Sequence, residues 1–485
     1  ALAGLVACSP AGEPESPGKD TPDAAVTVDA PPAPERAMPG DQGGEVAPAY
    51  APVVLDYGLK NVAAMNIRGV RFERLLEGLE QPWAMEFIDE RSLLITEFPG
   101  RMQRFELDTG VLTALDGVPE VASSRDQTGL LDVELHPDFA NNRKIYFSYT
   151  VSPDATDAYY LTVVSSAVLV DDRLEDVQSV LTADPPGWSP SNFGGALEFD
   201  DEGYLFVSIG DRSEERVAQR GDRLQGKILR LKDDGSVPAD NPFVGDPDVD
   251  DRIYALGVRN PQGLHFDAGH GLLFETEHGP MGGDEVNVIE RAVNYGWPVA
   301  TYGLKYTGAS VGSGTHAEGM RQPLFYFTPS IAVSPLTVYR GSQFPEWDGD
   351  LIIGTLKSRS LLRLDYDDGR IRSIHAFLGG LDQRIRDVRV GPEGALFVLT
   401  EPGRLYRLSR EIPPAVAQPN PSGEGLYALV CAGCHDTGAS GAPMLEDRAR
   451  WAEIARQSRA DIERHTLEGL GDMPERGLCD LCTDE

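Results

Sequence analysis

The chain has 485 residues and carries 77 Asp+Glu against 43 Lys+Arg, which gives a formal net charge of −34. This length permits one large domain with a small companion, and 41% hydrophobic residues are enough for a sizeable buried core. So large an acidic excess argues against nucleic acid as a partner, because phosphate binding requires a basic face. The 52 glycines and 36 prolines favour turns over long helices.

The first residues have the pattern of an export signal. The apolar run from Ala1 ends at Cys8, and Leu5-Val-Ala-Cys8 is typical of a bacterial lipoprotein cleavage box. We therefore expect residues 1–8 to be a signal remnant whose Cys8 carries a lipid anchor, with the protein in the periplasm at the outer membrane of a Gram-negative bacterium. The alternative is a short apolar segment with an isolated cysteine. Residues 9–65 are rich in Pro, Ala and acidic residues and lack periodicity, which predicts a disordered tether.

One pattern recurs six times between residues 66 and 410: an apolar strand, an Asp- or Gly-rich turn, and a second aliphatic or aromatic strand. The six hairpins are spaced by about 50 to 70 residues, and they begin near Trp83, Leu131, Ala196, Gly263, Leu336 and Val388. Repeated strand hairpins without amphipathic helices predict an all-β fold, a six-bladed β-propeller, rather than a βα barrel. Propellers bind ligands on the loops at the mouth of the central channel, so functional residues are expected there.

Several polar strings lie where such loops are expected. Arg259-Asn-Pro-Gln-Gly263 offers a guanidinium and two amides, and the Gly-rich string from Glu277 to Glu285 suits a hard cation held by oxygen atoms. Lys357 is expected on a strand. Arg384 and Arg386 are two residues apart, hence on one face of a strand. Together these cations are suited to a multiply anionic small molecule.

The order of the motifs resembles that of the soluble PQQ-dependent glucose and aldose sugar dehydrogenases, a family of six-bladed propellers. The matching strings are Gln127-Thr-Gly-Leu-Leu131, His136-Pro-Asp-Phe139, Ile209-Gly-Asp211, Gly226-Lys-Ile-Leu-Arg-Leu231, Arg259-Asn-Pro-Gln-Gly263, Glu277-His-Gly-Pro280, Asn294-Tyr-Gly-Trp-Pro298 and Arg384-Ile-Arg-Asp387. The resemblance covers residues 66–410 and implies PQQ and Ca²⁺ as cofactors and a sugar or related alcohol as the substrate.

The resemblance also implies roles for individual residues. It assigns the quinone to Arg259, Asn260, Gln262, Lys357, Arg384 and Arg386. It assigns the catalytic Ca²⁺ to the backbone carbonyls of Gly279 and Pro280, and a structural calcium to Glu285 and the Tyr295 carbonyl. Gln127 is implied near the sugar, and Arg259 belongs to the catalytic centre as well.

One departure from the family concerns the catalytic base. The family has a histidine in a His-x-Gly-x-Arg-Leu string, whereas this chain reads Ser191-Asn-Phe-Gly-Gly-Ala-Leu197, with Asn192 at the histidine position and Ala196 at that of the arginine. Asparagine does not titrate near neutral pH and cannot act as a base. Three possibilities follow: another group substitutes, the substrate differs, or sugar oxidation is lost. His136 and His278 are expected to be structural.

The last part of the chain contains Cys431-Ala-Gly-Cys434-His435, the attachment motif of a c-type haem. We expect thioethers at Cys431 and Cys434 and iron ligation by His435; a zinc or redox Cys-x-x-Cys is the alternative. Met473 in Gly471-Asp-Met-Pro474 is expected to be the distal iron ligand, and Met444 is the competing choice. Residues 411–422 are predicted to be a linker and residues 423–485 an all-α cytochrome c domain.

The end of the chain is similar to a subfamily of small class I cytochromes c. In that subfamily a disulfide follows the distal methionine, which implies a Cys479–Cys482 bridge here. The chain stops at Glu485, where these cytochromes would begin their last helix, so a C-terminally truncated domain is expected.

These observations lead to one functional hypothesis with two rivals. We expect a quinoprotein that oxidises an aldose or related alcohol and passes electrons through its own haem to a downstream cytochrome or respiratory acceptor. The first rival, favoured by Asn192, is a PQQ- or sugar-binding electron-transfer protein without turnover. The second is a scaffold that binds no PQQ.

Overall fold

The computed structural model describes residues 63–64, 70–123, 126–153 and 158–410, and from the C-terminal part residues 427, 435–436, 442–444, 446–458, 461–462 and 464–465. The predicted signal remnant, the linker 411–422 and all five cysteines lie outside the described residues. Of the predicted tether 9–65, only Ala63–Ala64 (β1) is described, and it forms a two-residue parallel bridge to a strand of the fifth sheet. Within the described residues, no helix is long and apolar enough to cross a membrane.

The described strands of residues 70–410 form six antiparallel sheets of four strands each, one of which gains β1 at its edge. In the first three sheets the strands are β3 (Pro82–Phe87), β4 (Ser92–Glu97), β5 (Arg101–Glu106) and β6 (Leu112–Ala114); β7 (Leu130–Leu135), β8 (Lys144–Val151), β9 (Leu161–Val170) and β10 (Arg173–Thr182); and β11 (Gly194–Phe199), β12 (Leu205–Ile209), β13 (Lys227–Leu231) and β14 (Ile253–Leu256). In the last three they are β15 (Pro261–Asp267), β16 (Leu272–Glu277), β17 (Asp284–Ile289) and β18 (Phe325–Phe327); β19 (Val333–Val338), β20 (Leu351–Thr355), β21 (Leu361–Asp367) and β22 (Arg370–Phe377); and β23 (Arg384–Val390), β24 (Leu396–Glu401), β25 (Arg404–Arg410) and β2 (Val70–Glu77).

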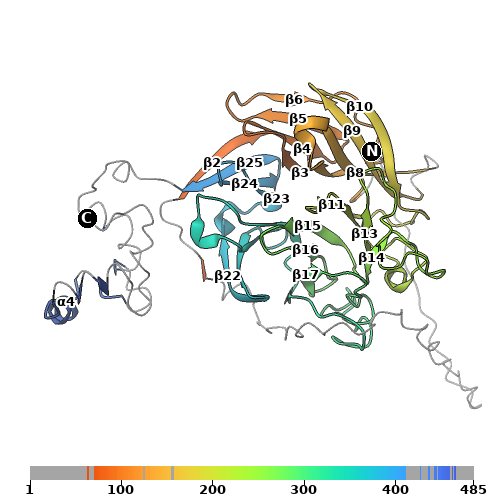
Figure 1. Ribbon diagram of the computed structural model, residues 1–485. Helices are drawn as coiled ribbons and strands as arrows, with labels where there is room; N and C mark the ends of the chain where they lie inside the picture. The colour runs from red at the N-terminus through yellow and green to blue at the C-terminus, as the bar shows by residue number, and fades with distance from the viewer. Residues whose placement is uncertain are drawn as a thin grey trace, which may run out of the picture. The chain divides into compact units, whose positions relative to one another are not determined.

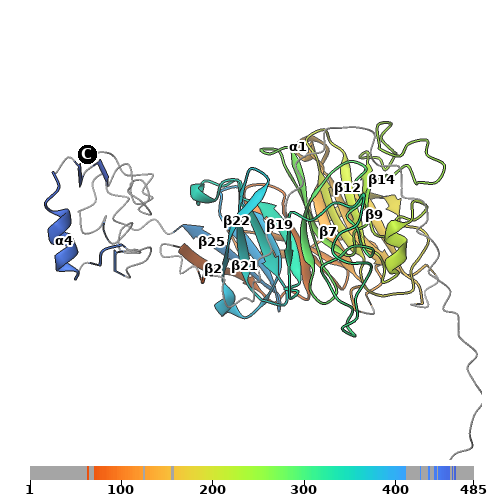
Figure 2. The same cartoon turned by 90° about the horizontal axis from the view of Figure 1, so that it is seen from below.

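The six sheets are the blades of a propeller. The first strand of each blade contacts the first strand of the next, in the circular order β3, β7, β11, β15, β19, β23 and back to β3. The ring is closed within the sixth blade, where β2 from the start of the domain pairs with β25 from its end (Figures 1 and 2). The predicted six-bladed β-propeller is thereby confirmed, and each predicted hairpin is formed by the first two strands of a blade.

Burial explains why these hairpins can be recognised in the sequence. The central strands β4, β12, β13 and β20 are buried along their whole length, because neighbouring blades cover both of their faces. A short continuous apolar run is the pattern expected of such a strand. The outer strand β10 is largely exposed and polar. The only α-helix described within the propeller, α1 (Phe139–Asn142), is a single turn between β7 and β8.

Ionisable groups from several first strands meet around one buried arginine. The Arg389 Nε donates to the Met85 carbonyl at 3.1 Å and lies 3.6–3.7 Å from Asp387 and Glu86, and its Nη2 lies 3.7 Å from Asp132. Glu134 and Glu198 add two further carboxyl groups to this cluster, and burial raises the pKa of both, to about 8 for Glu198. One guanidinium therefore faces more acidic groups than it can neutralise.

We predict that Glu198→Gln stabilises the propeller at alkaline pH and leaves its stability unchanged at pH 3.5, below the window in which Glu198 titrates. Because the pKa of Glu198 is raised from 4.5 to about 8, the folded protein retains a proton that the unfolded chain has already lost between these values. The contribution of Glu198 to the free energy of unfolding of the wild type therefore falls as the pH rises from 4.5 to about 8. Thermal unfolding at pH 8.5 should show the variant about 2–6 °C above the wild type.

A matched control is Glu175→Gln on the outer strand β10, where the side chain is 52% exposed. It should leave the unfolding temperature unchanged at both pH values. Identical melting curves for the wild type and Glu198→Gln at pH 8.5 would contradict the prediction.

Candidate functional site

A cleft of about 650 Å³ opens among the loops that precede the first strands and follow the second strands of the blades. Its walls are formed by Leu79, Glu80, Gln81, Trp83, Phe98, Asp126, Gln127, Gln262, His278, Ala332, Leu356, Arg384, Arg386, Glu401 and Pro402. Four of the predicted site residues, Gln127, Gln262, Arg384 and Arg386, are brought together here. The cleft combines aromatic walls with guanidinium and amide groups, the composition expected of a site for a polar aromatic ligand.

Both arginines of the cleft share one carboxylate. Arg384 Nε lies 2.7 Å from Glu401 Oε2, and Arg386 Nε donates to Glu401 Oε1 at 3.1 Å. The Arg386 side chain is 7% exposed, and its guanidinium lies 4.4 Å from the ring centre of Trp83. The two arginines lower the pKa of Glu401 against the effect of its burial. On this part of the wall two guanidinium groups share one carboxylate, which leaves a local excess of positive charge beside Trp83.

Lys357 differs from its expected position. Strand β20 ends at Thr355, so Lys357 lies in the bend after the strand rather than on it. It is exposed, and the wall of the cleft at this point is formed by its neighbour Leu356. Lys357 is nevertheless held at the end of the fifth blade, because its N–H donates to the Ile331 carbonyl at 3.0 Å.

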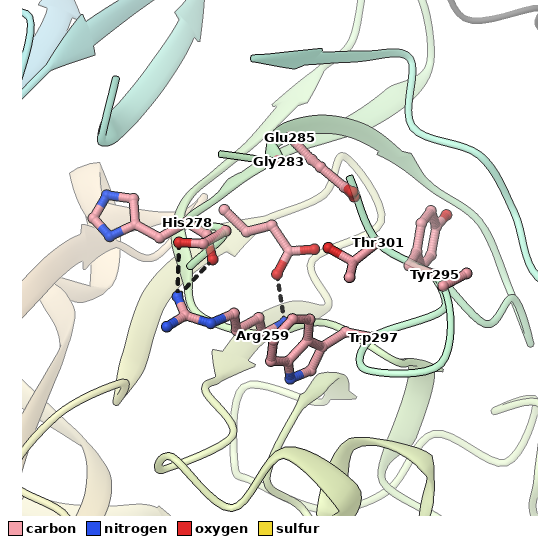
Figure 3. Close-up of a pocket in the computed structure, with 10 residues that line it drawn as sticks. Arg259, His278, Gly283, Glu285, Tyr295, Trp297 and Thr301 are labelled. Carbon is pink, nitrogen blue, oxygen red and sulfur yellow. Dashed lines mark hydrogen bonds between the residues drawn. The ribbon is translucent and has the colours of Figure 1, made fainter. Parts of the chain in front are cut away.

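Arg259 contacts backbone oxygens at the site predicted for Ca²⁺ (Figure 3). Its Nη1 donates to the carbonyls of His278 and Gly279 at 2.8 and 3.1 Å, and its backbone N–H donates to the carboxylate of Glu277. Gly279 is required at this point, because a Cβ atom there would lie 2.2 Å from the Gly282 carbonyl oxygen. The predicted quinone ligand and one of the predicted calcium-binding carbonyls are thus in direct contact.

The two amides of the Arg-Asn-Pro-Gln string have different surroundings. Asn260 is buried, and its Oδ1 accepts a hydrogen bond from the Gly194 N–H at 3.3 Å, which joins the third and fourth blades. Gln262 lines the cleft while its Nε2 donates to the Pro261 carbonyl at 3.2 Å.

Asn192 is turned away from the cleft toward a buried carboxylate. Its Nδ2 donates to Asp211 Oδ1 at 2.9 Å, and the Trp297 indole donates to Asp211 Oδ2 at 2.8 Å. Asn192 adopts a left-handed backbone conformation with φ 57° and is buried. Burial raises the pKa of Asp211. Both carboxylate oxygens of Asp211 are occupied, so neither residue offers a base to the cleft.

A small cavity of about 10 Å³ lies beside Arg259 and is lined by Glu277, Glu285 and Tyr295, among others (Figure 3). Burial raises the pKa of Glu277 to about 7 and that of Glu285 well above its usual value. Close by, the Glu275 Oε1 and Asn287 Oδ1 atoms are buried without a hydrogen-bond partner. Unpaired buried oxygens next to acidic groups fit a hard cation, which prefers oxygen ligands.

Side chains alone do not complete such a site. Among the described residues, no group of three or more His, Cys, Asp or Glu side chains forms a metal-binding cluster. A cation at Glu285, or at Gly279 and Pro280, would therefore depend on backbone carbonyls, as the sequence motifs imply. The residues present fit Ca²⁺ on these terms. The cleft fits PQQ by its size, its arginine pair and its aromatic rings.

In the C-terminal part, His435 has the hydrogen bond expected of a metal-ligating histidine. Its Nδ1 lies 2.8 Å from the Pro443 carbonyl, and because a carbonyl only accepts, Nδ1 carries the proton, which makes Nε2 the ring nitrogen suited to bind iron. The Trp451 ring, on α4 (Arg448–Ile454), lies 5.5 Å from the His435 ring, and its Nε1 donates to the Met444 carbonyl at 2.8 Å. Met473 and the cysteines lie outside the described residues.

Three residues of the site were missed by the sequence reasoning. Asp211 lies in the Ile209-Gly-Asp211 string, but no role was inferred for it. Glu401 is the last residue of the apolar strand β24 and shows no local pattern, so its pairing with two arginines is visible only in three dimensions. Asp126 directly precedes Gln127 and lines the cleft.

Comparison with known proteins confirms the family resemblance and the fold. Residues 79–407 match the glucose/sorbosone dehydrogenase family. The aldose sugar dehydrogenase YliI of Escherichia coli is 39% identical over 347 residues, which cover 70% of this chain and 93% of the relative. Quinoprotein glucose dehydrogenase B of Acinetobacter calcoaceticus is 29% identical and covers 67% of this chain and 84% of its own length.

Solved structures give the same result. The apo-form aldose sugar dehydrogenase of Escherichia coli superimposes with a TM-score of 0.68 at 39% identity, covering 70% of this chain and 99% of that chain. The PQQ-bound aldose sugar dehydrogenase of Streptomyces coelicolor has a TM-score of 0.59 at 25% identity and covers 70% and 98%.

The C-terminal part has its own relatives. Residues 418–485 match the family of subunit III of the cbb3-type cytochrome c oxidase. Cytochrome c5 of Azotobacter vinelandii is 35% identical over 71 residues, which are 13% of this chain and 80% of the relative. The chain therefore belongs to the glucose/sorbosone dehydrogenase family of sugar oxidoreductases and continues into a C-terminal cytochrome c domain.

Proposed function

We propose that this protein oxidises the anomeric hydroxyl of an aldose, or a related alcohol, with PQQ bound in the cleft and Ca²⁺ at Gly279 and Pro280, and that the electrons leave through its own haem c. The observation that carries the proposal is the cleft itself, whose walls combine Arg384, Arg386 and Gln262 with the Trp83 and Phe98 rings; His278 lines both this cleft and the cavity beside Arg259. PQQ, when bound, supplies an o-quinone that accepts two electrons, and Ca²⁺ polarises its carbonyl.

The residues of the chain bind and orient the quinone and the sugar. The guanidinium groups of Arg384 and Arg386 suit the carboxylates of the quinone, because Arg–carboxylate pairs are charge-assisted and bidentate. Arg259 lies beside the carbonyls of His278 and Gly279, where it can stabilise negative charge that develops near the cation. Gln127, positioned by its own backbone bond to Pro190, offers an amide to the sugar.

In the proposed reaction the quinone oxidises the sugar and the haem carries the electrons away. A quinone reduced by two electrons must release them singly to a haem, and a haem on the same chain makes that transfer intramolecular at a high effective concentration. We propose His435 and Met473 as the iron ligands, Cys431 and Cys434 as the thioether attachments, and a Cys479–Cys482 disulfide. We also propose a lipid anchor at Cys8 and a periplasmic location, where disulfides persist.

The proposal is tested by titrating the full chain with PQQ in the presence of Ca²⁺ and then assaying a panel of aldoses and polyols with an artificial electron acceptor. We expect PQQ to bind, at least one aldose to reduce the acceptor, and chelation of Ca²⁺ to remove the activity. Tight PQQ binding without turnover of any sugar would favour the electron-transfer protein suggested by Asn192. Absence of PQQ binding would overturn the proposal.

A further inference from the structure

The loss of the family histidine leaves the cleft in need of a proton acceptor. Four side chains on its walls can take up a proton: Glu80, Asp126, His278 and Glu401. The remaining charged groups there are Arg384 and Arg386. Each of the four candidates can be judged by its contacts.

Three of the four are engaged elsewhere. Glu401 is held by both arginines, which lower its pKa. The Glu80 carboxylate lies 2.9 Å from Arg101 Nη1. His278 Nε2 donates to the Val333 carbonyl at 2.6 Å. Asp126 is exposed and forms no ion pair with any described residue.

Asp126 also lies beside the position that the histidine has left. Three hydrogen bonds join residues 126–127 to residues 190–192: the Ser191 hydroxyl donates to Asp126 Oδ2, the Asn192 N–H donates to Gln127 Oε1 at 2.9 Å, and the Gln127 N–H donates to the Pro190 carbonyl at 3.1 Å. The segment that carries Asn192 therefore fixes Asp126 at the edge of the cleft, next to the glutamine implied for the sugar.

We propose that Asp126 is the general base of this enzyme and replaces the missing imidazole at Asn192. This inference rests on the proposed function. In the step, the O–H bond of the anomeric hydroxyl breaks and its proton passes to the Asp126 carboxylate. The C1–H bond breaks and its electron pair leaves with the hydrogen as hydride to the o-quinone cofactor, while a C1=O bond forms. The sugar is oxidised by two electrons to a lactone, the quinone is reduced by two, and Asp126 returns its proton to water.

The first test compares Asp126→Asn with Asp171→Asn, a matched control in the exposed turn between β9 and β10. Both variants are loaded with PQQ and Ca²⁺ and assayed with the best aldose of the wild type. We expect Asp126→Asn to lower kcat about 100-fold or more, the range for removal of a general base, with PQQ affinity unchanged. Asp171→Asn should match the wild type.

Rescue distinguishes a base from a structural residue. Adding Asn192→His to Asp126→Asn returns an imidazole to the family position, next to Asp211, and should restore kcat at least about tenfold. If Asp126→Asn keeps full turnover, or if His278→Gln removes turnover while Asp126→Asn does not, the proposal is wrong.

A second measurement does not depend on turnover. A water-soluble carbodiimide with glycinamide labels accessible carboxyl groups of the full chain, and peptide mass spectrometry reports the label at each aspartate. We expect PQQ with Ca²⁺ to protect Asp126 at least fivefold and to leave Asp171 unprotected. Equal labelling of Asp126 in PQQ-free and PQQ-loaded protein would overturn its place at the reaction centre, whereas failure of PQQ to bind at all would overturn the proposed function instead.

Discussion

Arg386→Gln is expected to weaken PQQ binding by about 100-fold or more. In the proposed complex Arg386, which is buried beside Glu401 and the Trp83 ring, pairs with a carboxylate of the quinone. Removing one partner of such a buried protein–ligand charge pair costs about 3 kcal/mol or more, and 100-fold in affinity corresponds to about 2.7 kcal/mol. The variant should fold, because Arg384 Nε remains 2.7 Å from Glu401 and keeps that carboxylate paired. Equilibrium titration with PQQ in excess Ca²⁺ measures the effect.

The control for Arg386→Gln is Arg359→Gln. Arg359 is 47% exposed and pairs with Asp382 at 2.7 Å outside the cleft. This variant should bind PQQ as the wild type does, and both variants should unfold at similar temperatures. Wild-type PQQ affinity in a folded Arg386→Gln protein would show that the arginine pair is not the anion site.

His435→Ala is expected to abolish the low-spin haem spectrum and sugar-driven haem reduction while leaving sugar oxidation with an artificial acceptor within about twofold of the wild type. The reason is that His435 is the proposed iron ligand and would bind the metal through Nε2, because its Nδ1 lies 2.8 Å from the Pro443 carbonyl. Optical spectra before and after addition of sugar report both properties in one sample.

His465→Ala is the matched control, because it removes an imidazole from the same part of the chain outside the Cys-x-x-Cys-His motif. It should keep both the spectrum and sugar-driven reduction. A His435→Ala protein that retains a six-coordinate low-spin spectrum would contradict the assignment of the iron ligand.

The propeller was predictable because its signal is repeated and local. Each hairpin is a pair of short buried strands around a polar turn, so the same pattern appears six times in one chain. The closure by β2 was not predictable, since nothing local in Val70–Glu77 indicates that its partner lies in Arg404–Arg410.

The candidate site was predictable only in part. The arginine motif is recognisable by residue type and spacing, but the sharing of Glu401 by Arg384 and Arg386 depends on packing between two strands of one blade. Lys357 is predicted on the strand that contains Leu351–Gly354, whereas β20 stops at Thr355. The exchange of a histidine for Asn192 could be read directly, but the contact of its neighbour Ser191 with Asp126 could not.

The pairing of β2 with β25 has a consequence for how the molecule is made. The two strands of this last pair are separated by more than three hundred positions, as Val70 faces Arg410. A nascent chain that has not yet been synthesised as far as β25 leaves β2 without its neighbour, so ring closure must be a late, non-local event. Deleting a few residues of β25 should therefore lower the yield of folded protein far more than cutting the chain in a turn between blades. In a circular permutant opened at such a turn, β25 and β2 would be joined in sequence and would pair as a local hairpin.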